Sequence, residues 1–218
     1  MTRIYIYDHC PFCVRATMVA GYKKVPFQRE VLLNDDEQTC FDLIGKKMLP
    51  VLQHGEQVIG ESLDICQKLD EIGDAERVIL PQTALAEQFS EAFSAAQPAN
   101  WKLNFARVTR IGLPEFATDS ARDYFRGKKE EMIGETFEEA FAKTDEYLPP
   151  VNQALANLPT LTLPSEREGR LSWDDVMIFP MLRSLTLVNG LEWPEPVRNY
   201  LNEVADLTRL DLYFDRAI

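Results

Sequence analysis

The sequence has 218 residues, of which 45% are hydrophobic and 27% charged, as in ordinary globular proteins of one or two domains. Its formal net charge of -12 argues against a nucleic-acid partner, because proteins neutralise phosphates with clustered Lys and Arg. No apolar run approaches the ~20 residues of a membrane span, and the first residues are too polar for a secretory signal. We therefore expect a cytoplasmic protein without a membrane partner.

The chain opens with an apolar strand predicted over residues 3–7 and a helix predicted over residues 11–23. The segment Cys10-Pro11-Phe12-Cys13 lies at the junction of these two elements. A helix that begins near Pro11 directs free backbone N–H groups and the positive end of its dipole at Cys10, which stabilises a thiolate. Because Cys13 follows one turn later, the junction predicts a redox-active thiol pair with Cys10 as the nucleophile.

Three other roles compete with redox chemistry for this cysteine pair. A structural disulfide is unnecessary, because a chain of 218 residues can bury a sufficient core without one. Two buried structural cysteines would not fit the polar Asp8-His9 that precedes them. A zinc site would need further ligands at metal spacing, and we expect no metal. Cys40 and Cys66 stand alone in the sequence, and the two histidines, His9 and His54, are not paired on any helical face.

The rest of the first 72 residues continues the alternation of strands and helices. A short connection containing Gly55 joins two apolar runs, so these strands should pair antiparallel. The predicted order is βαβαββα, as in thioredoxin-like domains. The remaining elements are expected as a strand at 27–33, a helix from the acidic residues 35–37 to Gly45, hairpin strands at 51–53 and 57–59, and a helix from Glu61-Ser62 to about Gly73.

Beyond residue 72 the pattern becomes entirely helical. We expect residues 1–72 to form one domain, 73–83 a linker, and 84–218 an all-helical domain, so the fold class is α/β followed by all-α. Ser172 and Asp175 have the spacing of a capping box and should serve folding. Five helices are predicted to form a bundle, over residues 84–107, 120–132, 137–155, 173–188 and 196–207.

With these two parts the chain resembles the two-domain bacterial glutaredoxins of the glutathione transferase superfamily. Ordinary proteins of this fold with two cysteines at this spacing lack both the Glu61-Ser62 pair and the helical domain. The resemblance implies a glutathione-dependent thiol-disulfide oxidoreductase, with glutathione as co-substrate and disulfide or glutathionylated proteins as partners, and it favours a monomer. It covers nearly the whole chain and rests on the segments 7–13, 31–36, 49–52, 61–62 and 182–188.

The same resemblance implies the residues that bind glutathione. Pro50 is expected to be a cis-proline that turns the backbone of Leu49 towards the bound peptide. Glu61 and Ser62 are expected to receive the γ-glutamyl end, although Ser62 also fits a plain helix N-cap. Tyr7 either borders the glutathione site or packs as an aromatic residue at the end of its strand.

In the expected reaction Cys10 attacks a glutathione mixed disulfide, and either free glutathione or Cys13 then resolves the product. A conjugating transferase is one alternative, but such enzymes activate glutathione with a Tyr or Ser hydroxyl, and this chain offers a cysteine at that position. An iron-sulfur carrier that uses Cys10 and glutathione is another, and Pro11 argues against it. Cys40 and Cys66 are expected to be buried and unreactive.

Overall fold

Four short strands form the sheet of the N-terminal part, and the computed structural model describes all residues from 1 to 218. β1 is parallel to β2 and antiparallel to β3, and β3 is antiparallel to β4, so the order across the sheet is β2-β1-β3-β4. The antiparallel hairpin predicted from the glycine-containing connection is confirmed. The strands are β1 (Thr2–Ile6), β2 (Gln28–Val31), β3 (Val51–His54) and β4 (Gln57–Ile59).

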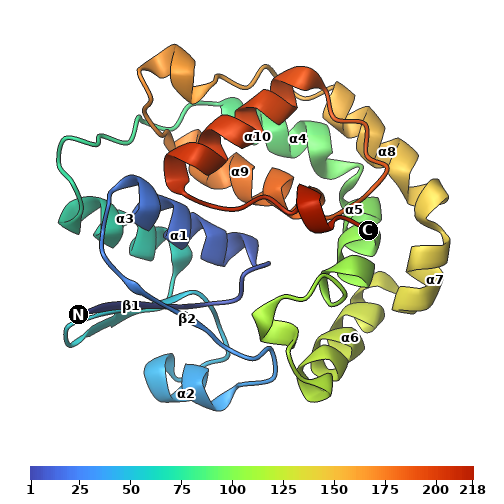
Figure 1. Ribbon diagram of the computed structural model, residues 1–218, viewed down its shortest axis with the longest axis horizontal. Helices are drawn as coiled ribbons and strands as arrows, with labels where there is room; N and C mark the ends of the chain where they lie inside the picture. Colours follow the sequence, from blue (N-terminus) through green and yellow to red (C-terminus); the bar gives the residue numbers. More distant parts are fainter.

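Three helices pack on this sheet and complete the βαβαββα order expected from the sequence. α1 (Pro11–Tyr22) and α3 (Ser62–Ile72) cover one face, and α2 (Gln38–Ile44) covers the other (Figure 1). α2 ends at Gly45, whose φ of 71° lies in the left-handed region that glycine adopts without a steric penalty. The thioredoxin-like first part is therefore confirmed.

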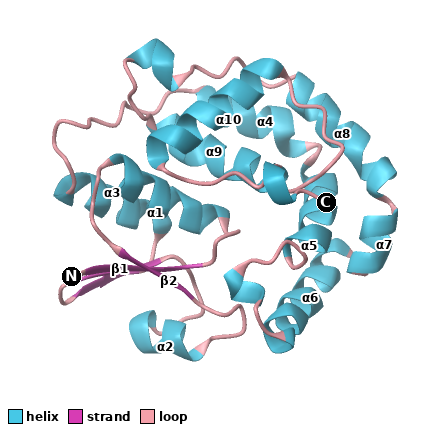
Figure 2. Cartoon of the chain, viewed as in Figure 1, coloured by secondary structure: helices cyan, strands magenta, loops and turns pink.

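The rest of the chain is helical and packs against α1, on the side of that helix away from the sheet (Figure 2). None of its helices is both long enough and apolar enough to cross a bilayer. The α-helices are α4 (Leu85–Ser94), α5 (Gln97–Val108), α6 (Asp119–Ile133), α7 (Phe137–Ala142), α8 (Thr144–Ala156), α9 (Trp173–Leu185) and α10 (Glu195–Thr208), and the short 3₁₀ helices are η1 (Pro114–Phe116), η2 (Pro164–Arg167) and η3 (Phe214–Arg216).

The prediction of five helices in this part was wrong, because two of them are interrupted and the structure has seven. The stretch 84–107 breaks before Pro98, since proline lacks a backbone N–H and is favoured in the first turn of a new helix. The stretch 137–155 breaks at Lys143, where the backbone leaves the helical region at φ -93° and ψ 21°. There the Thr144 hydroxyl donates to the Phe141 carbonyl at 2.6 Å.

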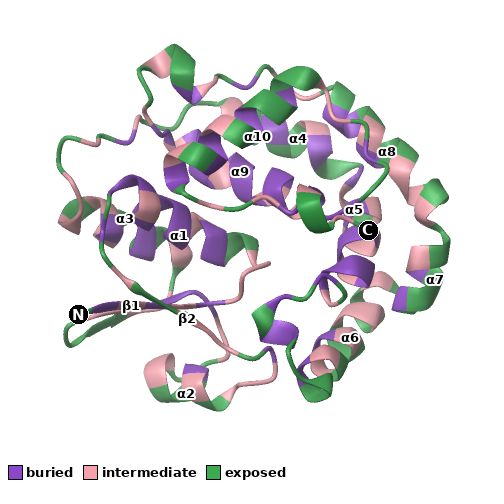
Figure 3. Cartoon of the chain, viewed as in Figure 1, coloured by how far each residue is buried: buried purple, intermediate pink, exposed green.

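α1 is the element that joins the two parts of the molecule. It packs against β1 and α3 on one side and against α9 and α10 on the other. Eight of its twelve residues are buried, so almost no face of this helix is exposed (Figure 3). A helix that is apolar around most of its circumference must be covered on several sides. The helical part therefore supplies half of the environment of the helix that begins at the cysteine pair.

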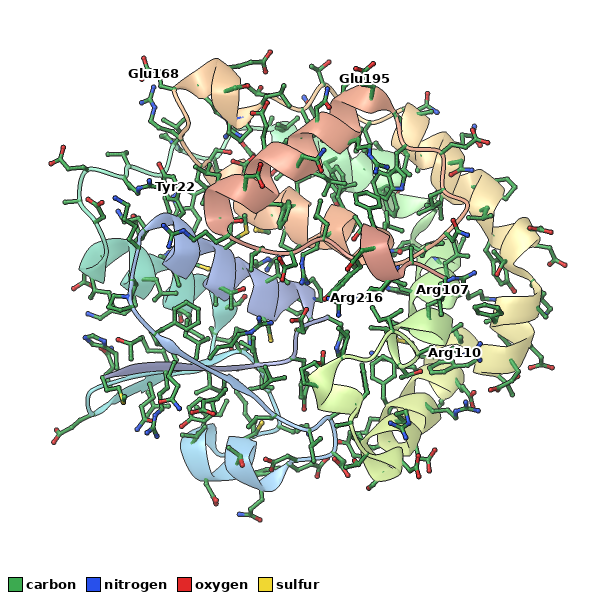
Figure 4. The ribbon with its side chains drawn as sticks, in the orientation of Figure 1. Tyr22, Arg107, Arg110, Glu168, Glu195 and Arg216 are labelled. Carbon is green, nitrogen blue, oxygen red and sulfur yellow. The ribbon has the colours of Figure 1, made fainter.

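Two buried side chains hydrogen-bond to the segment after α3 and to the C-terminus. At the end of α1, Tyr22 donates its hydroxyl to the Val78 carbonyl at 3.0 Å (Figure 4). On α5, the Arg107 guanidinium donates to the carbonyl of the last residue, Ile218, at 2.8 Å and to the Thr144 hydroxyl at 2.6 Å. Because Arg107 is only 1% exposed, these bonds hold the C-terminus against the helical core.

Replacing Gly21 with alanine should destabilise the fold by about 1–3 kcal/mol or more, because the close approach of α1 to α10 leaves no room for a side chain. A Cβ at this position would lie 2.1 Å from the carbonyl oxygen of Thr208. Urea unfolding measures the loss. Gly127, which lies in α6 with open space around its Cβ position, is the matched control. Gly127→Ala should stabilise the protein by about 0.5–1 kcal/mol, and equal effects of both variants would contradict the packing argument.

Candidate functional site

The strand register brings two segments to the same end of the sheet as the cysteine pair. Tyr5, near the end of β1, pairs with Val51 at the start of β3. The chain that leaves β1 towards the cysteine pair therefore lies at the end of the sheet where the Leu49-Pro50 segment enters β3. Leu52 pairs with Ile59, so the chain leaving β4 delivers Glu61-Ser62 there as well. These segments and the start of α1 form the candidate active site.

The two cysteines differ in exposure although they lie one helical turn apart. Cys10 is the N-cap residue of α1 and is half-buried, with Pro11 as the first helical residue. Cys13 lies inside the first turn and is 1% exposed, and the backbone N–H of Tyr7 donates to its sulfur at 3.4 Å. Both are free thiols in this structure. An external disulfide can therefore reach Cys10 but not Cys13.

The surroundings also shift the pKa values of the two thiols in opposite directions. The hydrogen bond from Cys13 lowers the pKa of Cys10, and burial partly opposes this effect. The charge of His9 and the backbone N–H groups of Cys13 and Phe12 lower the pKa of Cys10 further, to about 6. Burial raises the pKa of Cys13 well above its ordinary value, and the bond to Cys10 adds to this. Near neutral pH the pair therefore consists of a Cys10 thiolate beside a Cys13 thiol.

The residue before Cys10 is bound by the helical part of the protein. The backbone N–H and the Nδ1 of His9 both approach Oε1 of Glu115, at 3.0 and 2.7 Å. Glu115 belongs to η1 and its side chain is completely buried, whereas the His9 side chain is 16% exposed. The His9 ring stacks on Tyr7 and contacts the rings of Phe116 and Phe125. A carboxylate over a hundred residues away thus fixes the orientation of this imidazole.

A second buried network holds Asp8. Arg183 of α9 donates to the Asp8 carboxylate and to the Asp8 carbonyl at 2.8 and 2.9 Å, and its side chain is 4% exposed. Tyr213 and Arg29 also donate to the carboxylate. Burial raises the pKa of Asp8, but the Arg183 charge and these hydrogen bonds outweigh it and bring the pKa to about 2. The loop that leads to Cys10 is therefore pinned to the helical part by an ion pair.

The other residues proposed from the sequence lie around this end of the sheet. The Leu49–Pro50 peptide bond is cis, as the resemblance implies. Glu61 is the N-cap of α3 and Ser62 is its first residue, and no side chain caps the helix, so the plain N-cap role considered for Ser62 is wrong. Glu61 forms an exposed ion pair with Lys46 at 3.1 Å. The Tyr7 hydroxyl donates to the Asn34 carbonyl at 3.1 Å, and burial raises the pKa of this phenol.

Ser172 and Asp175 lie away from the cysteines, at the start of α9. The Ser172 hydroxyl accepts from the Asp175 N–H at 3.2 Å, and the Asp175 carboxylate accepts from the Ser172 N–H at 2.8 Å. Asp175 also binds Arg167 and accepts from Tyr200 at 2.9 Å. Ser172 and Asp175 therefore form a reciprocal helix cap, as their spacing predicts.

The remaining cysteines are buried, as expected. Both Cys40 and Cys66 are 0% exposed. Burial raises the pKa of Cys66 to about 12 and also raises that of Cys40, so neither thiol ionises readily.

The roles of His9 and Glu115 were missed in the sequence. A histidine directly before the cysteine pair is a usable signal, although the sequence analysis above draws from Asp8-His9 only that the segment before Cys10 is polar. Glu115 offered a weaker signal, because it is an acidic residue between Pro114 and Phe116 in an otherwise apolar turn. Nothing in its local pattern pairs it with His9.

A cavity of about 480 Å³ lies away from the cysteine pair. It lies at the opposite end of α1, where Gly21 and Lys24 face Thr208 and Arg209 at the end of α10. The candidate site therefore rests on the thiol chemistry at the start of α1 and not on cavity size.

Two family models match the chain. A model described as glutaredoxin 2, C terminal domain, matches residues 88–217, and one described as glutathione S-transferase, N-terminal domain, matches residues 9–72. Glutaredoxin 2 of Escherichia coli K12 is 35% identical over 218 residues, which is 99% of this chain and 100% of that protein. Protein IN2-1 homolog B of Oryza sativa subsp. indica is 28% identical over 51% of this chain and 47% of its own length.

Solved structures agree with these matches. Glutaredoxin 2 of Salmonella typhimurium, in complex with glutathione, superposes with a TM-score of 0.88 at 34% identity, over 100% of this chain and 99% of that one. Glutathione transferase GSTFuA3 of Phanerochaete chrysosporium superposes with a TM-score of 0.64 at 18% identity, over 95% of this chain and 94% of that one. The second likeness shows the shared two-domain fold.

Proposed function

Because the chain belongs to the glutaredoxin 2 family of glutathione-dependent disulfide oxidoreductases, we propose that Cys10 is its attacking thiolate and Cys13 its resolving thiol. The observation that carries this assignment is the asymmetry of the pair. Cys10 is reachable and its pKa is lowered to about 6, whereas Cys13 is buried and its pKa is raised. Only Cys10 combines access with thiolate character, and both are needed for attack on a disulfide.

The first step joins the Cys10 sulfur to the glutathione sulfur of a mixed disulfide. The original S–S bond breaks, its electron pair leaves with the other sulfur, and that thiolate takes a proton from water. A free glutathione thiolate then attacks the Cys10–glutathione bond and forms glutathione disulfide. Cys10 returns as a thiolate, so one free glutathione thiol is consumed, and the second half of the glutathione disulfide is the glutathione that the mixed disulfide already carried.

Protein disulfides require a second route in which Cys13 takes part. After Cys10 has attacked, Cys13 loses its proton and attacks the Cys10 sulfur, which releases the reduced protein and leaves a Cys10–Cys13 disulfide. Two glutathione molecules then reopen this bond. The hydrogen bond between the two thiols supports this order, because it keeps Cys13 protonated until Cys10 has lost its charge.

We propose that glutathione binds as co-substrate beside Cys10, with Leu49, Pro50, Glu61, Ser62 and Tyr7 around it. The shared end of the sheet supports this, and so does the glutathione complex of the Salmonella homologue. In this arrangement the Ser62 hydroxyl and the backbone N–H groups at the N-terminus of α3 donate hydrogen bonds to the γ-glutamyl carboxylate. The ammonium group pairs with Glu61, which Lys46 now contacts. Tyr7 contributes a ring face, because its hydroxyl is bound to Asn34.

We further propose that residues 1–72 form the redox domain, 73–83 the linker and 84–218 the helical domain. The bounds of the flanking helices support this, since α3 ends at Ile72 and α4 begins at Leu85. The partners are disulfide-containing and glutathionylated proteins, and the working form is a monomer. A reducing compartment such as the cytoplasm suits this chemistry, because it supplies glutathione and keeps thiols free.

The geometry does not favour the conjugating alternative. Conjugation requires a hydroxyl that stabilises the glutathione thiolate. Tyr7 carries the hydroxyl group at the end of the first strand. Its O–H is donated to a backbone carbonyl and burial raises its pKa, so it is not available as such a donor. Cys10 would form a disulfide with glutathione instead.

The Cys13→Ser variant tests the assignment of the two thiols. It should reduce a small glutathione mixed disulfide at a rate within about tenfold of the wild type, because free glutathione completes the monothiol route without Cys13. Its reduction of protein disulfides should fall much further. Both rates can be followed by coupling to glutathione reductase and NADPH. Complete loss of the first activity in a folded variant would show that Cys13 is more than a resolving thiol.

A further inference from the structure

Glu115 is a buried carboxylate with an incomplete set of partners. Its Oε1 accepts from both the backbone N–H and the Nδ1 of His9, while its Oε2 is buried and has no hydrogen-bond partner in the protein. Burying a carboxylate in this way costs free energy unless an opposite charge compensates it. The groups that face it are His9, Cys13 and Tyr213. Of these, only His9 can carry a positive charge.

The surroundings of the His9 ring suit a charged imidazolium. Its Nδ1 must carry a hydrogen, because the carboxylate oxygen 2.7 Å away can only accept. The ring is enclosed by the faces and edges of Tyr7, Phe116 and Phe125, with centroid distances of 5.8, 5.1 and 5.4 Å. Aromatic faces attract cations, and the side chain remains 16% exposed, which gives solvent access for protonation.

Most of the groups that contact His9 come from the helical domain. Glu115, Phe116 and Phe125 all come from that domain, whereas His9 and Cys10 are adjacent on the loop before α1. Besides His9, the charged and titratable groups that act on Cys10 are Cys13, Tyr7 and Arg15 from its own domain and Lys129 from α6. His9 is the only one of these fixed by a buried carboxylate.

We propose that Glu115 is a positioning residue for the thiol chemistry: its buried carboxylate holds His9 as a charged neighbour of Cys10 and thereby keeps Cys10 as a thiolate. This inference rests on the proposed function of Cys10. It gives the helical domain a direct part in the reactivity of the thioredoxin-like domain. Removing Glu115 should lower the reactivity of Cys10 even though its carboxylate binds His9 and not the Cys10 sulfur.

The sign of the effect distinguishes this role from a simple electrostatic one. A negative charge near Cys10 disfavours the thiolate, so if Glu115 acted only through space its removal would lower the pKa of Cys10. If Glu115 acts through His9, its removal takes away the positive charge and raises the pKa of Cys10. A merely structural role would lower the melting temperature and leave the pKa of Cys10 unchanged.

The test is the pH dependence of alkylation of Cys10 by iodoacetamide, with peptide mapping to confirm the site. In Glu115→Gln we expect the midpoint to rise by about one pH unit, which lowers the alkylation rate near pH 6 by about fivefold. His9→Gln should give a similar shift, and the double variant should shift no further than either single one. Glu135→Gln is the control, because Glu135 is a carboxylate of the same domain that binds Lys102 and Lys143 instead.

Three outcomes would overturn the proposal: a midpoint that falls or stays constant in Glu115→Gln, an equal shift in Glu135→Gln, or a full additional shift when Glu115→Gln is combined with His9→Gln. Should Glu115→Gln not fold, His9→Gln alone decides, since an unchanged midpoint there removes the imidazolium from the explanation. Alkylation reports the thiolate directly and without turnover. The two proposals can therefore fail separately. A wild-type protein that shows the expected alkylation midpoint but does not reduce disulfides contradicts only the proposed function.

Discussion

Replacing Cys10 with serine is expected to abolish glutathione-dependent reduction of a mixed disulfide, with a loss of roughly a thousandfold or more in rate. A serine hydroxyl does not ionise near neutral pH, so the hydrogen bonds that lower the pKa of the Cys10 thiol to about 6 have no thiolate to stabilise. The neighbouring Cys13 cannot replace it, because it is buried and its pKa is raised. The measurement is the rate of NADPH oxidation in an assay coupled to glutathione reductase.

The matched control for this variant is Cys66→Ala. Cys66 is a fully buried thiol of α3 whose pKa is raised to about 12, so its removal should leave the rate of mixed-disulfide reduction near that of the wild type. Substantial turnover by a folded Cys10→Ser protein would mean that another thiol is the nucleophile. Loss of activity in both variants would point to damage to the fold instead.

Replacing Arg183 with methionine should destabilise the protein by about 3–5 kcal/mol, because it leaves a buried carboxylate without its main counter-charge. Arg183 donates three hydrogen bonds, two to Asp8 and one to the Asp211 carbonyl at 2.8 Å, and its guanidinium lies on the Tyr213 ring. Arg29 is the remaining cation at Asp8 but its side chain is 43% exposed, so it compensates only in part. Urea unfolding gives the loss.

Arg198→Met is the control for this substitution. Arg198 is an exposed residue of α10 whose guanidinium also lies on an aromatic ring, that of Phe214, and its loss should cost no more than about 1 kcal/mol. Because Asp8 lies two residues before Cys10, Arg183→Met should also slow alkylation of Cys10 in the folded protein. A variant with wild-type stability and reactivity would show that the ion pair between the two domains contributes little.

The N-terminal domain could be predicted from the sequence because its signals are local. Apolar runs alternate with helical periodicity, Gly45 ends a helix with a positive φ, and a glycine-containing connection joins the hairpin strands. The cysteine pair was also recognisable from its position between a strand and a helix. In each case the residues that determine the structure are close together in the chain.

The parts that could not be predicted depend on distant contacts. Nothing in the local pattern around Lys143 reveals that the helix breaks there, because the break involves a threonine hydroxyl that also binds Arg107. The burial of α1 on nearly all sides follows from packing against α9 and α10. The pairs His9–Glu115 and Asp8–Arg183 join residues more than a hundred positions apart, so only the tertiary structure brings them together.

The central claim is that Cys10 carries the glutathione adduct, and trapping that adduct tests it most directly. The Cys13→Ser protein would be incubated with glutathione disulfide and mapped by peptide mass spectrometry. We expect a single glutathione per chain, on Cys10, that free glutathione removes. An adduct on Cys40 or Cys66, or no adduct at all on a folded protein, would contradict the assignment of Cys10 as the nucleophile.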